Sequence, residues 1–393
     1  MKKRTLLLGH SYWGRGGAEI AAMCLIQELC VRYRLDIVTR GGWDIEELNR
    51  CAGTNVRDDQ IGAVKYVPCA PRENGFGGAI WHGLFLRYCR VLAPKYDLCI
   101  TASRVINWGQ PAIHFLSDVA WNLPLQRKFD CVEFDGSSGL AKKAYFYLAR
   151  LAAGQTCRMP EEHDLFIANS EWTASESAPY LSRPAVVIYP PVTPANEGGV
   201  FGERKLASFI CLGRVAPEKE IEAVFDILQS VRAQGHAVTL DVVGGGDGAY
   251  FDFIQKKASS MGDWIRMCGP MYGEEKEGLL RQADFGISAC IREAFGMATV
   301  EMMQAGVITV VPSEGAQSEI VKDPLLIYEG EDNAVRKITS LLDDPSLKDD
   351  LRHSLYQEVS KYNTSRFAVE IEDVLESEWE FLAQEVRSSA TDQ

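Results

Sequence analysis

The chain has 393 residues, enough for about two globular domains, and its hydrophobic fraction of 46% excludes a disordered or fibrous protein. The net charge of −13 lies mostly in the C-terminal end, because residues 301–393 hold 8 Lys and Arg against 20 Asp and Glu, whereas residues 1–200 hold 22 against 20. Binding to a nucleic-acid backbone needs clustered positive charge, so this distribution argues against a nucleic-acid partner.

Cysteine usage and the N-terminus indicate a cytoplasmic protein. The 11 cysteines are scattered and form no C-x-x-C pair, which favours a reducing compartment over a disulfide framework or a structural zinc site. A basic start, Met1–Arg4, is followed by an apolar run that ends at Gly9, so we expect a first buried strand rather than a signal peptide. No segment approaches the roughly 20 apolar residues that span a bilayer.

Short apolar runs alternate with longer amphipathic stretches along the chain, a pattern typical of parallel sheets covered by helices on both faces. The expected strands of the first half are residues 4–9, 35–39, 97–102, 165–169 and 186–189. Those of the second half are residues 208–212, 238–243, 265–268, 285–288 and 307–311. The pattern predicts two doubly wound domains, with ligands at the C-terminal ends of the strands.

A polar stretch rich in Pro and Gly, residues 190–199, separates the two halves, since it can continue neither a helix nor a central strand. We therefore expect one Rossmann-like domain at residues 1–190 and a second at 191–365. Residues 366–393 carry an apolar stripe at helical spacing and are expected to pack back on the first domain.

The first expected strand ends in a glycine-rich turn that contains Gly16 and Gly17 and leads into a helical pattern. Such glycines allow a backbone to approach a ligand closely, although a simple strand-to-helix turn is the alternative. The order G-x-G-G departs from the dinucleotide fingerprint, and Asp36 precedes the core of its strand instead of following it. A nicotinamide-dependent dehydrogenase is therefore disfavoured.

Two cations follow the first strand of the second half. Arg214 comes directly after Gly213, and Lys219 lies five residues further on, so one planar guanidinium and one ammonium could hold a diphosphate. The alternative is a pair of solvated cations at a helix cap. The glycines at residues 244–246 favour a tight turn over a nucleotide cradle.

The segment between Glu293 and Glu301 combines a loop carboxylate, a glycine turn at Gly296 and the start of a helix. The free N–H groups and the dipole of a helix N-terminus attract phosphate oxygens. Glu293 is expected in the loop and Glu301 on the helix, so the two carboxylates do not share a helical face and do not predict an acid/base pair. A helix-starting glutamate plus a surface glutamate is the alternative.

Together, these motifs resemble the retaining glycosyltransferases of family 4, whose two Rossmann-like domains face each other across a cleft in the GT-B architecture. The resemblance covers nearly the whole chain and rests on the order and spacing of G-G-A-E, A-N-S-E-W-T, the Pro-Pro-Val linker, G-R-x-x-x-E-K, G-G-G and E-A-F-G-x-x-x-x-E-x-x-x-x-G. It implies an α/β fold with a C-terminal helix crossing back to the N-domain. Two departures are Glu220, where a glycine is usual, and residues 290–292, which replace a more polar stretch.

The resemblance also implies the roles of individual residues. Arg214 and Lys219 would hold the donor diphosphate, Glu293 would face the donor sugar, Glu301 would bind the ribose, and His114 would contact the sugar. Because a histidine at a strand end is often structural, that alternative stays open for His114. The remaining expected donor-binding residues are Gly16, Gly17, Gly213, Met271, Ala294, Phe295, Gly296, Met297 and Ala298.

Donor, acceptor and mechanism are expected as follows. The donor is UDP-glucose, with GDP-mannose as the alternative, and no cofactor is implied. No metal ion is expected, and the chain contains no D-x-D triplet. The acceptor is a saccharide or a lipid-linked saccharide bound near Trp13, Trp108 and Trp121, unless these tryptophans belong to the core.

Two other functions fit the same architecture, a sugar-nucleotide epimerase and a catalytically silent sugar-nucleotide-binding protein. Basic and apolar residues in 140–153 suggest peripheral contact with a membrane, although a core helix is the alternative.

Overall fold

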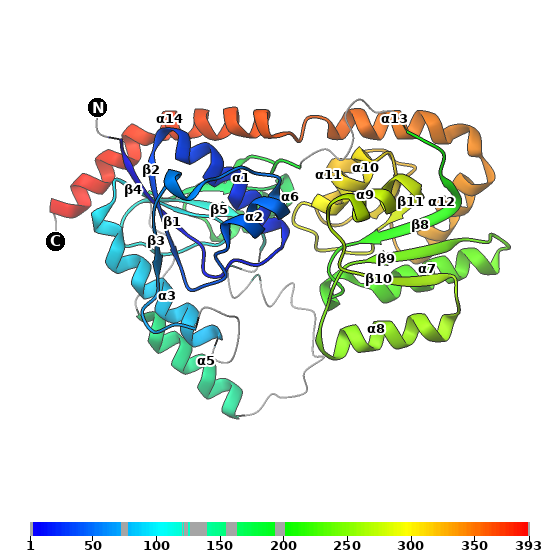
Figure 1. Cartoon of the computed structure of the whole chain (residues 1–393), viewed down its shortest axis with the longest axis horizontal. Helices are drawn as coiled ribbons and strands as arrows, with labels where there is room; N and C mark the ends of the chain where they lie inside the picture. Colours follow the sequence, from blue (N-terminus) through cyan, green and yellow to red (C-terminus); the bar gives the residue numbers. More distant parts are fainter. Residues whose placement is uncertain are drawn as a thin grey trace. The chain divides into compact units, whose positions relative to one another are not determined.

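The structure, a computed structural model, describes residues 3–71, 78–119, 121, 125, 140–154, 163–192 and 201–391. These residues form two compact units (Figure 1). Unit 1 contains the described residues up to 191 together with residues 364–391, and unit 2 contains the described residues from 192 to 363.

Unit 1 is built on a seven-stranded sheet whose strands pair in parallel in the order β3-β2-β1-β4-β5-β6-β7. Its strands are β1 (Thr5–Gly9), β2 (Arg34–Thr39), β3 (Ile61–Tyr66), β4 (Leu98–Thr101), β5 (Ala112–Leu116), β6 (Leu165–Ala168) and β7 (Val186–Val187). Its α-helices include α1 (Gly17–Arg32), α2 (Ile45–Ala52), α3 (Gly78–Leu92), α5 (Leu140–Ala153), α6 (Glu171–Ser177) and α14 (Thr364–Thr391).

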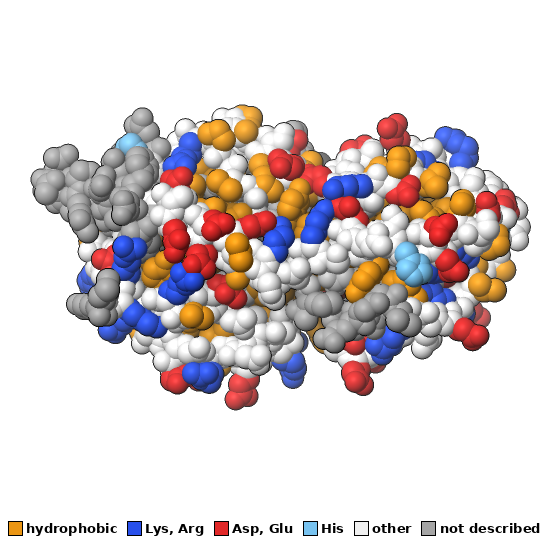
Figure 2. All heavy atoms as spheres, turned by 90° about the horizontal axis from the view of Figure 1, so that it is seen from above, with side chains coloured by type: hydrophobic (Ala, Val, Ile, Leu, Met, Phe, Trp, Pro, Cys, Tyr) orange, Lys and Arg blue, Asp and Glu red, His pale blue; other side chains and the backbone are white. Residues whose placement is uncertain are grey.

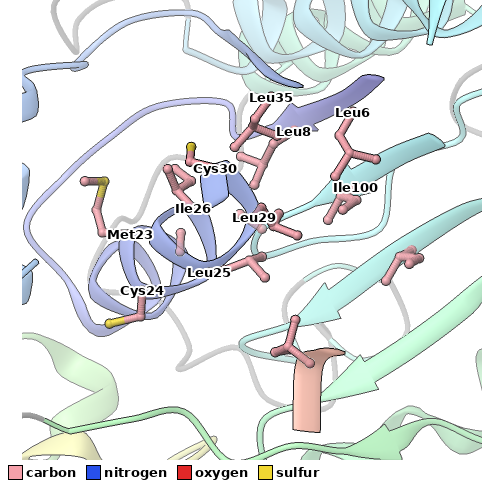
Figure 3. Close-up of a cluster of buried hydrophobic side chains, with 14 of the residues drawn as sticks. Leu6, Leu8, Met23, Cys24, Leu25, Ile26, Leu29, Cys30, Leu35 and Ile100 are labelled. Carbon is pink, nitrogen blue, oxygen red and sulfur yellow. The ribbon is translucent and has the colours of Figure 1, made fainter. Parts of the chain in front are cut away.

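The main core of unit 1 lies between α1 and the sheet (Figure 3). Leu25, Ile26 and Leu29 of α1 are at most 2% exposed and pack with Leu6 and Leu8 of β1. This burial explains why β1 is a continuous apolar run, since a central parallel strand is covered on both faces.

The long helix α14 contributes to the same core. Phe367, Ile371 and Leu375, spaced four residues apart, are buried within it. Further along the helix, Glu378 accepts two hydrogen bonds from the guanidinium of Arg183, at 2.9 and 3.2 Å. Helix α14, coloured orange to red in Figure 1, is therefore part of unit 1.

Unit 2 contains a six-stranded sheet, again with parallel pairs, in the order β10-β9-β8-β11-β12-β13. Its strands are β8 (Lys205–Leu212), β9 (Thr239–Val243), β10 (Ile265–Gly269), β11 (Ala283–Ile287), β12 (Ile308–Pro312) and β13 (Ile327–Tyr328). Its α-helices are α7 (Ile221–Ala233), α8 (Gly248–Met261), α9 (Gly273–Gln282), α10 (Met297–Gln304), α11 (Gln317–Val321), α12 (Glu331–Asp343) and α13 (Lys348–Val359).

The order of the first six strands of unit 1, 3-2-1-4-5-6, is repeated in unit 2, and it is the order of a doubly wound nucleotide-binding fold. The predicted α/β class with two Rossmann-like sheets is thus confirmed. In both sheets the first strand of the unit lies in the middle, so the loops that follow β1 and β8 stand at the switch point where ligands bind in such folds.

Surface charge and helix hydropathy limit the possible partners. On the face drawn in Figure 2, the described Lys and Arg side chains are interspersed with Asp and Glu, so that face presents no extended basic patch for nucleic acid. Among the described helices, none is long and apolar enough to cross a membrane.

Candidate functional site

The loops that follow β8 and β9 are joined at the C-terminal edge of the unit 2 sheet. The N–H of Gly213 donates to the carbonyl of Val243 at 3.0 Å, and the N–H of Gly244 donates to the carbonyl of Gly269 at 2.9 Å. A Cβ atom on Gly244 would lie 1.8 Å from the carbonyl oxygen of Gly213, and its φ is +158°. Glycine is therefore required here for close packing of two loops, which is the role of a tight turn.

Arg214 and Lys219 both follow this edge. The Arg214 side chain is 68% exposed and lies 2.6 Å from Glu218, four residues further on. The ammonium of Lys219, at the end of the 3₁₀ turn η5 (Pro217–Lys219), forms an ion pair with the carboxylate of Glu293. The side chains of Lys219 and Glu293 are 23% and 21% exposed, so this pair is partly shielded from water while Arg214 is accessible.

The protonation states of this cluster follow from its neighbours. Burial by itself would lower the pKa of Lys219, but the negative charge of Glu293 and the hydrogen bond that Glu293 accepts from the ammonium raise that pKa above its ordinary value. Burial, reinforced by Glu293, raises the pKa of the Cys290 thiol to about 12. At neutral pH the cluster therefore contains a protonated lysine and an un-ionised thiol.

The backbone of the Glu293 loop is fixed by the segment before α11. The N–H of Ala316 donates to the carbonyl of Glu293 at 2.8 Å. Gly315 has φ +76°, and a Cβ there would lie 3.0 Å from the Glu293 nitrogen, so the two segments are in close contact. The position of Glu293 thus depends on a contact between segments about 20 residues apart in the chain.

Helix α10 begins at Met297 and is preceded by the N-cap residue Gly296, which has φ +100°. Its first turn is anchored to α11, because the hydroxyl of Thr299 donates to the side-chain oxygen of Gln317 at 2.8 Å, and the amide of Gln317 donates to the carbonyl of Cys290 at 2.9 Å. Both side chains are buried. This pair orients the N-terminus of α10, where free N–H groups can bind an anion.

Glu301 lies one turn further along α10 and has its own cation. Its Oε1 atom is 3.0 Å from the ammonium of Lys276 on α9. The two glutamates of the motif are therefore on different structural elements, Glu293 in the loop and Glu301 on the helix, and each is paired with a lysine.

A small pocket that opens to solvent lies at this edge of unit 2, and neither Glu301 nor Lys276 is among its lining residues. Of the residues expected from sequence, the pocket is lined by Gly213, Arg214, Lys219, Glu293 and Ala298. Three other lining residues are polar, Ser288, Thr299 and Gln317, and of these Ser288 and Gln317 were not anticipated from the sequence.

Several other expected site residues have packing roles. Phe295 is 3% exposed and stands edge-on to Tyr362 at 5.5 Å, and Met271 is half-buried against the cluster that includes Leu280. The side chain of Phe295 is thus part of the core. Ala294, Gly296 and Met297 lie in the backbone between Glu293 and the pocket-lining Ala298.

In unit 1, Gly16 and Gly17 stand at the start of α1. Glu19 of the same G-G-A-E motif accepts a hydrogen bond from the N–H of Gly16 at 2.9 Å and lies 3.2 Å from His10. Burial by itself would raise the pKa of Glu19, but its interactions with His10 and its hydrogen bonds from the backbone together outweigh burial and lower the pKa, so the carboxylate is ionised. Glu19 therefore stabilises the glycine turn of its own motif through this hydrogen bond.

His114, expected to contact the sugar, lies inside β5 with a fully buried side chain. Its Nδ1 atom is 2.5 Å from the hydroxyl of Thr101, its Nε2 atom is 3.2 Å from Asp164, and its ring stacks on Phe166. The environment of His114 within unit 1 is that of a structural histidine, the alternative noted from sequence. Its sugar contact stays a prediction.

The tryptophans expected near the acceptor are mostly core residues. Trp13 and Trp108 are 3% and 1% exposed, whereas Trp121 is half-buried and donates to Ser177 at 3.3 Å. Core packing, the alternative noted from the sequence, therefore holds for Trp13 and Trp108, since both pack inside hydrophobic clusters.

Comparison with known proteins finds a family similarity for unit 2. Residues 201–362, nearly all of this unit, match the family described as Glycosyl transferases group 1. A search of curated proteins found no match to the chain.

Solved structures share the fold over the whole chain. Alr3699/HepE of Anabaena, in complex with UDP and glucose, is 15% identical with a TM-score of 0.66, over 95% of this chain and 100% of that one. Sucrose-phosphate synthase of Thermosynechococcus elongatus is 15% identical with a TM-score of 0.67, over 95% and 99%. WaaG, a glycosyltransferase involved in lipopolysaccharide biosynthesis, is 12% identical with a TM-score of 0.67, over 94% and 99%. The chain therefore has the two Rossmann-like domains of GT-B glycosyltransferases.

Proposed function

We propose that this protein is a retaining glycosyltransferase that moves a hexosyl group from a nucleoside-diphosphate sugar to a saccharide or lipid-linked acceptor. One observation carries the proposal: Arg214, Lys219 and Glu293 converge with the N-terminus of α10 on a single pocket at the C-terminal edge of β8. Two cations and a helix N-terminus suit a diphosphate, and a neighbouring carboxylate suits a sugar hydroxyl.

The donor diphosphate would exchange with the carboxylates that now hold these cations. Arg214 is exposed, and exposed ion pairs such as its contact with Glu218 contribute only about 0–1 kcal/mol, so the guanidinium is readily available. Lys219 is held by Glu293, and a phosphate oxygen reaching Lys219 would leave Glu293 able to accept hydrogen bonds from the sugar. Binding of the diphosphate and orientation of the sugar would then be coupled through one ion pair.

Catalysis would follow from the charge that develops on the leaving group. The bond between the anomeric carbon and the diphosphate oxygen breaks, the leaving group takes the electron pair, and Arg214, Lys219 and the α10 N–H groups stabilise it. The acceptor oxygen attacks from the same face, and its proton passes to the departing phosphate. These groups already supply the positive charge that the leaving group needs, so we propose a metal-independent reaction.

Attack by Glu293 as a nucleophile is the alternative route to retention. The family resemblance noted from the sequence favours same-face attack instead. Mass spectrometry of the enzyme quenched during turnover decides between the two: a glycosylated peptide containing Glu293 would replace same-face attack by a double displacement, whereas unmodified enzyme with a retained anomeric configuration supports same-face attack.

UDP-glucose is the proposed donor, and GDP-mannose is the alternative. The similar HepE structure that contains UDP and glucose supports this choice. A thermal-shift screen of nucleotide sugars tests it, because a ligand that binds only the folded chain raises its stability. UDP-glucose should raise the melting temperature most; if neither UDP nor GDP sugars shift it, the proposed function is wrong.

A transfer assay separates the proposal from an epimerase on the same architecture. Labelled UDP-glucose incubated with saccharide acceptors should yield a labelled glycoside and UDP. Interconversion of the free donor without an acceptor would instead identify an epimerase, and binding without either reaction would identify a silent sugar-nucleotide-binding protein.

For the acceptor side, we propose peripheral contact with an anionic membrane on the cytoplasmic side, through α3 and α5 of unit 1. The two helices contain five Lys and Arg and no Asp or Glu, in a chain with net charge −13. They pack closely, because a Cβ on Gly83 would lie 2.5 Å from the carbonyl oxygen of Ala149. Tyr147, Leu148 and Leu151 of α5 are 63%, 52% and 56% exposed. Exposed apolar side chains among basic ones are typical of helices that lie on membranes.

Vesicle flotation tests this contact. The wild-type protein should float with vesicles that contain phosphatidylglycerol but not with pure phosphatidylcholine, and the Leu148→Ser/Leu151→Ser variant should lose most of that binding. Leu325→Ser is the matched control, since Leu325 is 49% exposed in unit 2. Equal flotation of the double variant and the wild type would exclude α5 as the membrane contact.

A further inference from the structure

Glu301, the residue assigned above to the ribose, is held by a lysine that no sequence motif singles out. The ammonium of Lys276 lies 3.0 Å from Oε1 of Glu301, and the two side chains are 23% and 21% exposed. These exposures equal those of the Lys219–Glu293 pair. The second motif glutamate is thus as strongly shielded from water, and as directly paired, as the first.

The helices that carry this pair are fixed independently of it. The guanidinium of Arg204 donates to the carbonyls of Leu280 and Ala283 at the end of α9, at 3.1 and 2.6 Å, and also to the carbonyl of Ala305 at the end of α10. One partly buried side chain therefore joins the C-terminal ends of both helices, which lie beside each other in Figure 1. Since Arg204 already fixes the backbones, the Lys276–Glu301 contact sets the direction of a side chain.

The geometry leaves one carboxylate oxygen of Glu301 for a ligand. Lys276 occupies Oε1, and a carboxylate has two oxygens with about four lone-pair sites in total. The other oxygen, Oε2, can accept hydrogen bonds from the two adjacent hydroxyls of a ribose. The cation has a second effect, because it offsets the repulsion between ionised Glu301 and the diphosphate of the same donor.

We propose that Lys276 is a positioning residue that orients the Glu301 carboxylate toward the ribose diol of the donor. This inference rests on the proposed function, since it needs a nucleoside diphosphate in the unit 2 pocket. It holds for any base, because UDP and GDP carry the same ribose. Lys276 touches neither the sugar nor the reacting atoms in this role, and it acts through Glu301.

Isothermal titration of UDP, or of GDP if that binds more tightly, tests the proposal when it is paired with the 2′,3′-dideoxy form of the same nucleotide. For Lys276→Met we expect the Kd of the ribonucleotide to rise about tenfold, because the Glu301 carboxylate is then no longer directed at the diol and its hydrogen bonds to the ribose weaken. The Kd of the dideoxy nucleotide should change by less than about twofold, because it has no diol for Glu301 to bind. Lys276→Arg, which keeps the charge, should recover most of the affinity.

The matched control is Lys257→Met. Lys257 is 24% exposed and forms an ion pair with Asp226 at 2.7 Å, on helices α8 and α7. Its loss should leave both affinities unchanged. Lys276→Gln, which keeps a hydrogen-bond donor without charge, provides a second variant should Lys276→Met fold poorly.

The outcomes separate the inference from the function beneath it. If Lys276→Met weakens the binding of the ribonucleotide and of its dideoxy form equally, Lys276 acts only by general attraction for the diphosphate and the positioning role is wrong. Unchanged binding of the ribonucleotide overturns the role as well. If the wild type binds neither UDP nor GDP, the proposed function itself fails, and the role of Lys276 with it.

Discussion

Replacing Lys219 by methionine separates binding of the donor from stability of the fold, because one ion pair serves both. Lys219 would contribute a charge-assisted hydrogen bond to the diphosphate, worth about 1.5–3 kcal/mol. Its loss should therefore lower kcat/KM by roughly 13- to 160-fold. The assay is transfer from the donor that gives the largest thermal shift, and a variant that keeps more than half of the wild-type kcat/KM refutes the phosphate assignment.

The stability cost of Lys219→Met follows from the partner left behind. Glu293 would stay about one-fifth exposed without its cation. Loss of an exposed ion pair costs about 0–1 kcal/mol of stability, and breaking a buried pair costs about 3–5 kcal/mol. The Lys219–Glu293 pair lies between these cases, so Lys219→Met should lower the free energy of unfolding, measured by urea denaturation, by roughly 1–2 kcal/mol. Lys219→Met/Glu293→Gln should recover most of this stability without recovering activity. A double variant no more stable than the single one would show that the pair does not stabilise the loop.

The contribution of Lys219 to stability depends on pH with a definite sign. The pKa of Lys219 is raised in the folded chain, so its contribution to stability is fully present below the unfolded value near 10.5 and is lost only as pH rises through the folded value. The difference in unfolding free energy between wild type and Lys219→Met should hence stay constant from pH 6 to 9.

Three further predictions concern the units separately. Burial, with two nearby arginines, lowers the pKa of His82 to about 4. The free energy of unfolding should therefore fall by about 2–3 kcal/mol between pH 7 and 4.5, because the unfolded state takes up a proton there and the folded state does not. His82→Asn should lose this pH dependence, and a variant with the same pH profile of urea midpoints as the wild type would contradict the role of His82. Asp284 is 1% exposed and paired with Arg352. Asp284→Ala should therefore destabilise unit 2 by about 3–5 kcal/mol in urea denaturation, because it leaves the Arg352 charge buried without its partner. A loss of stability below about 1 kcal/mol would show that Arg352 finds another partner. Glu220 has φ +49°, so Glu220→Gly should be about 1 kcal/mol more stable than Glu220→Ala in the same assay, and the reverse order would exclude strain at this position.

The strands that the sequence predicts are those with continuous apolar runs. Ten such strands are present in the structure within a few residues of the expected bounds. Of the other three strands, β5 was expected only as the strand that carries His114. The missed strands are β3, whose side chains are almost all only half-buried, and β13, which has two residues. Neither has enough buried apolar residues to form a recognisable run, because β3 and β13 are the edges of their sheets.

His114 shows where sequence position alone misleads. It belongs to β5, a strand that continues for two residues beyond it, so its side chain lies within the sheet and not in the loop that follows. The sequence Ala-Ile-His-Phe-Leu gives no sign of Thr101 on β4 or of Asp164, which enclose the ring. Those contacts depend on strand pairing, which a single sequence does not reveal.

The local motifs of the candidate site were predictable, whereas the residues that support them were not. Gly213, Arg214 and Lys219 follow one strand, and chain order alone brings them near each other. Lys276 and Gln317 act on residues 25 and 18 positions away, through the packing of α9 and α11 beside α10. No periodicity or spacing in the sequence records such a contact.

The two departures from the glycosyltransferase pattern are explained together by the structure. Glu220 occupies a left-handed conformation in which a side chain is strained, and this accounts for the glycine usual at that position. Arg292, in the other unusual segment, lies 3.3 Å from the carboxylate of Glu220, and it directly precedes Glu293 in the chain. Since Glu220 likewise directly follows Lys219, this ion pair joins the neighbours of the Lys219–Glu293 pair. The attraction between Glu220 and Arg292 offsets part of the backbone strain and links the η5 turn a second time to the Glu293 loop, so the two unusual residues act as one compensated contact.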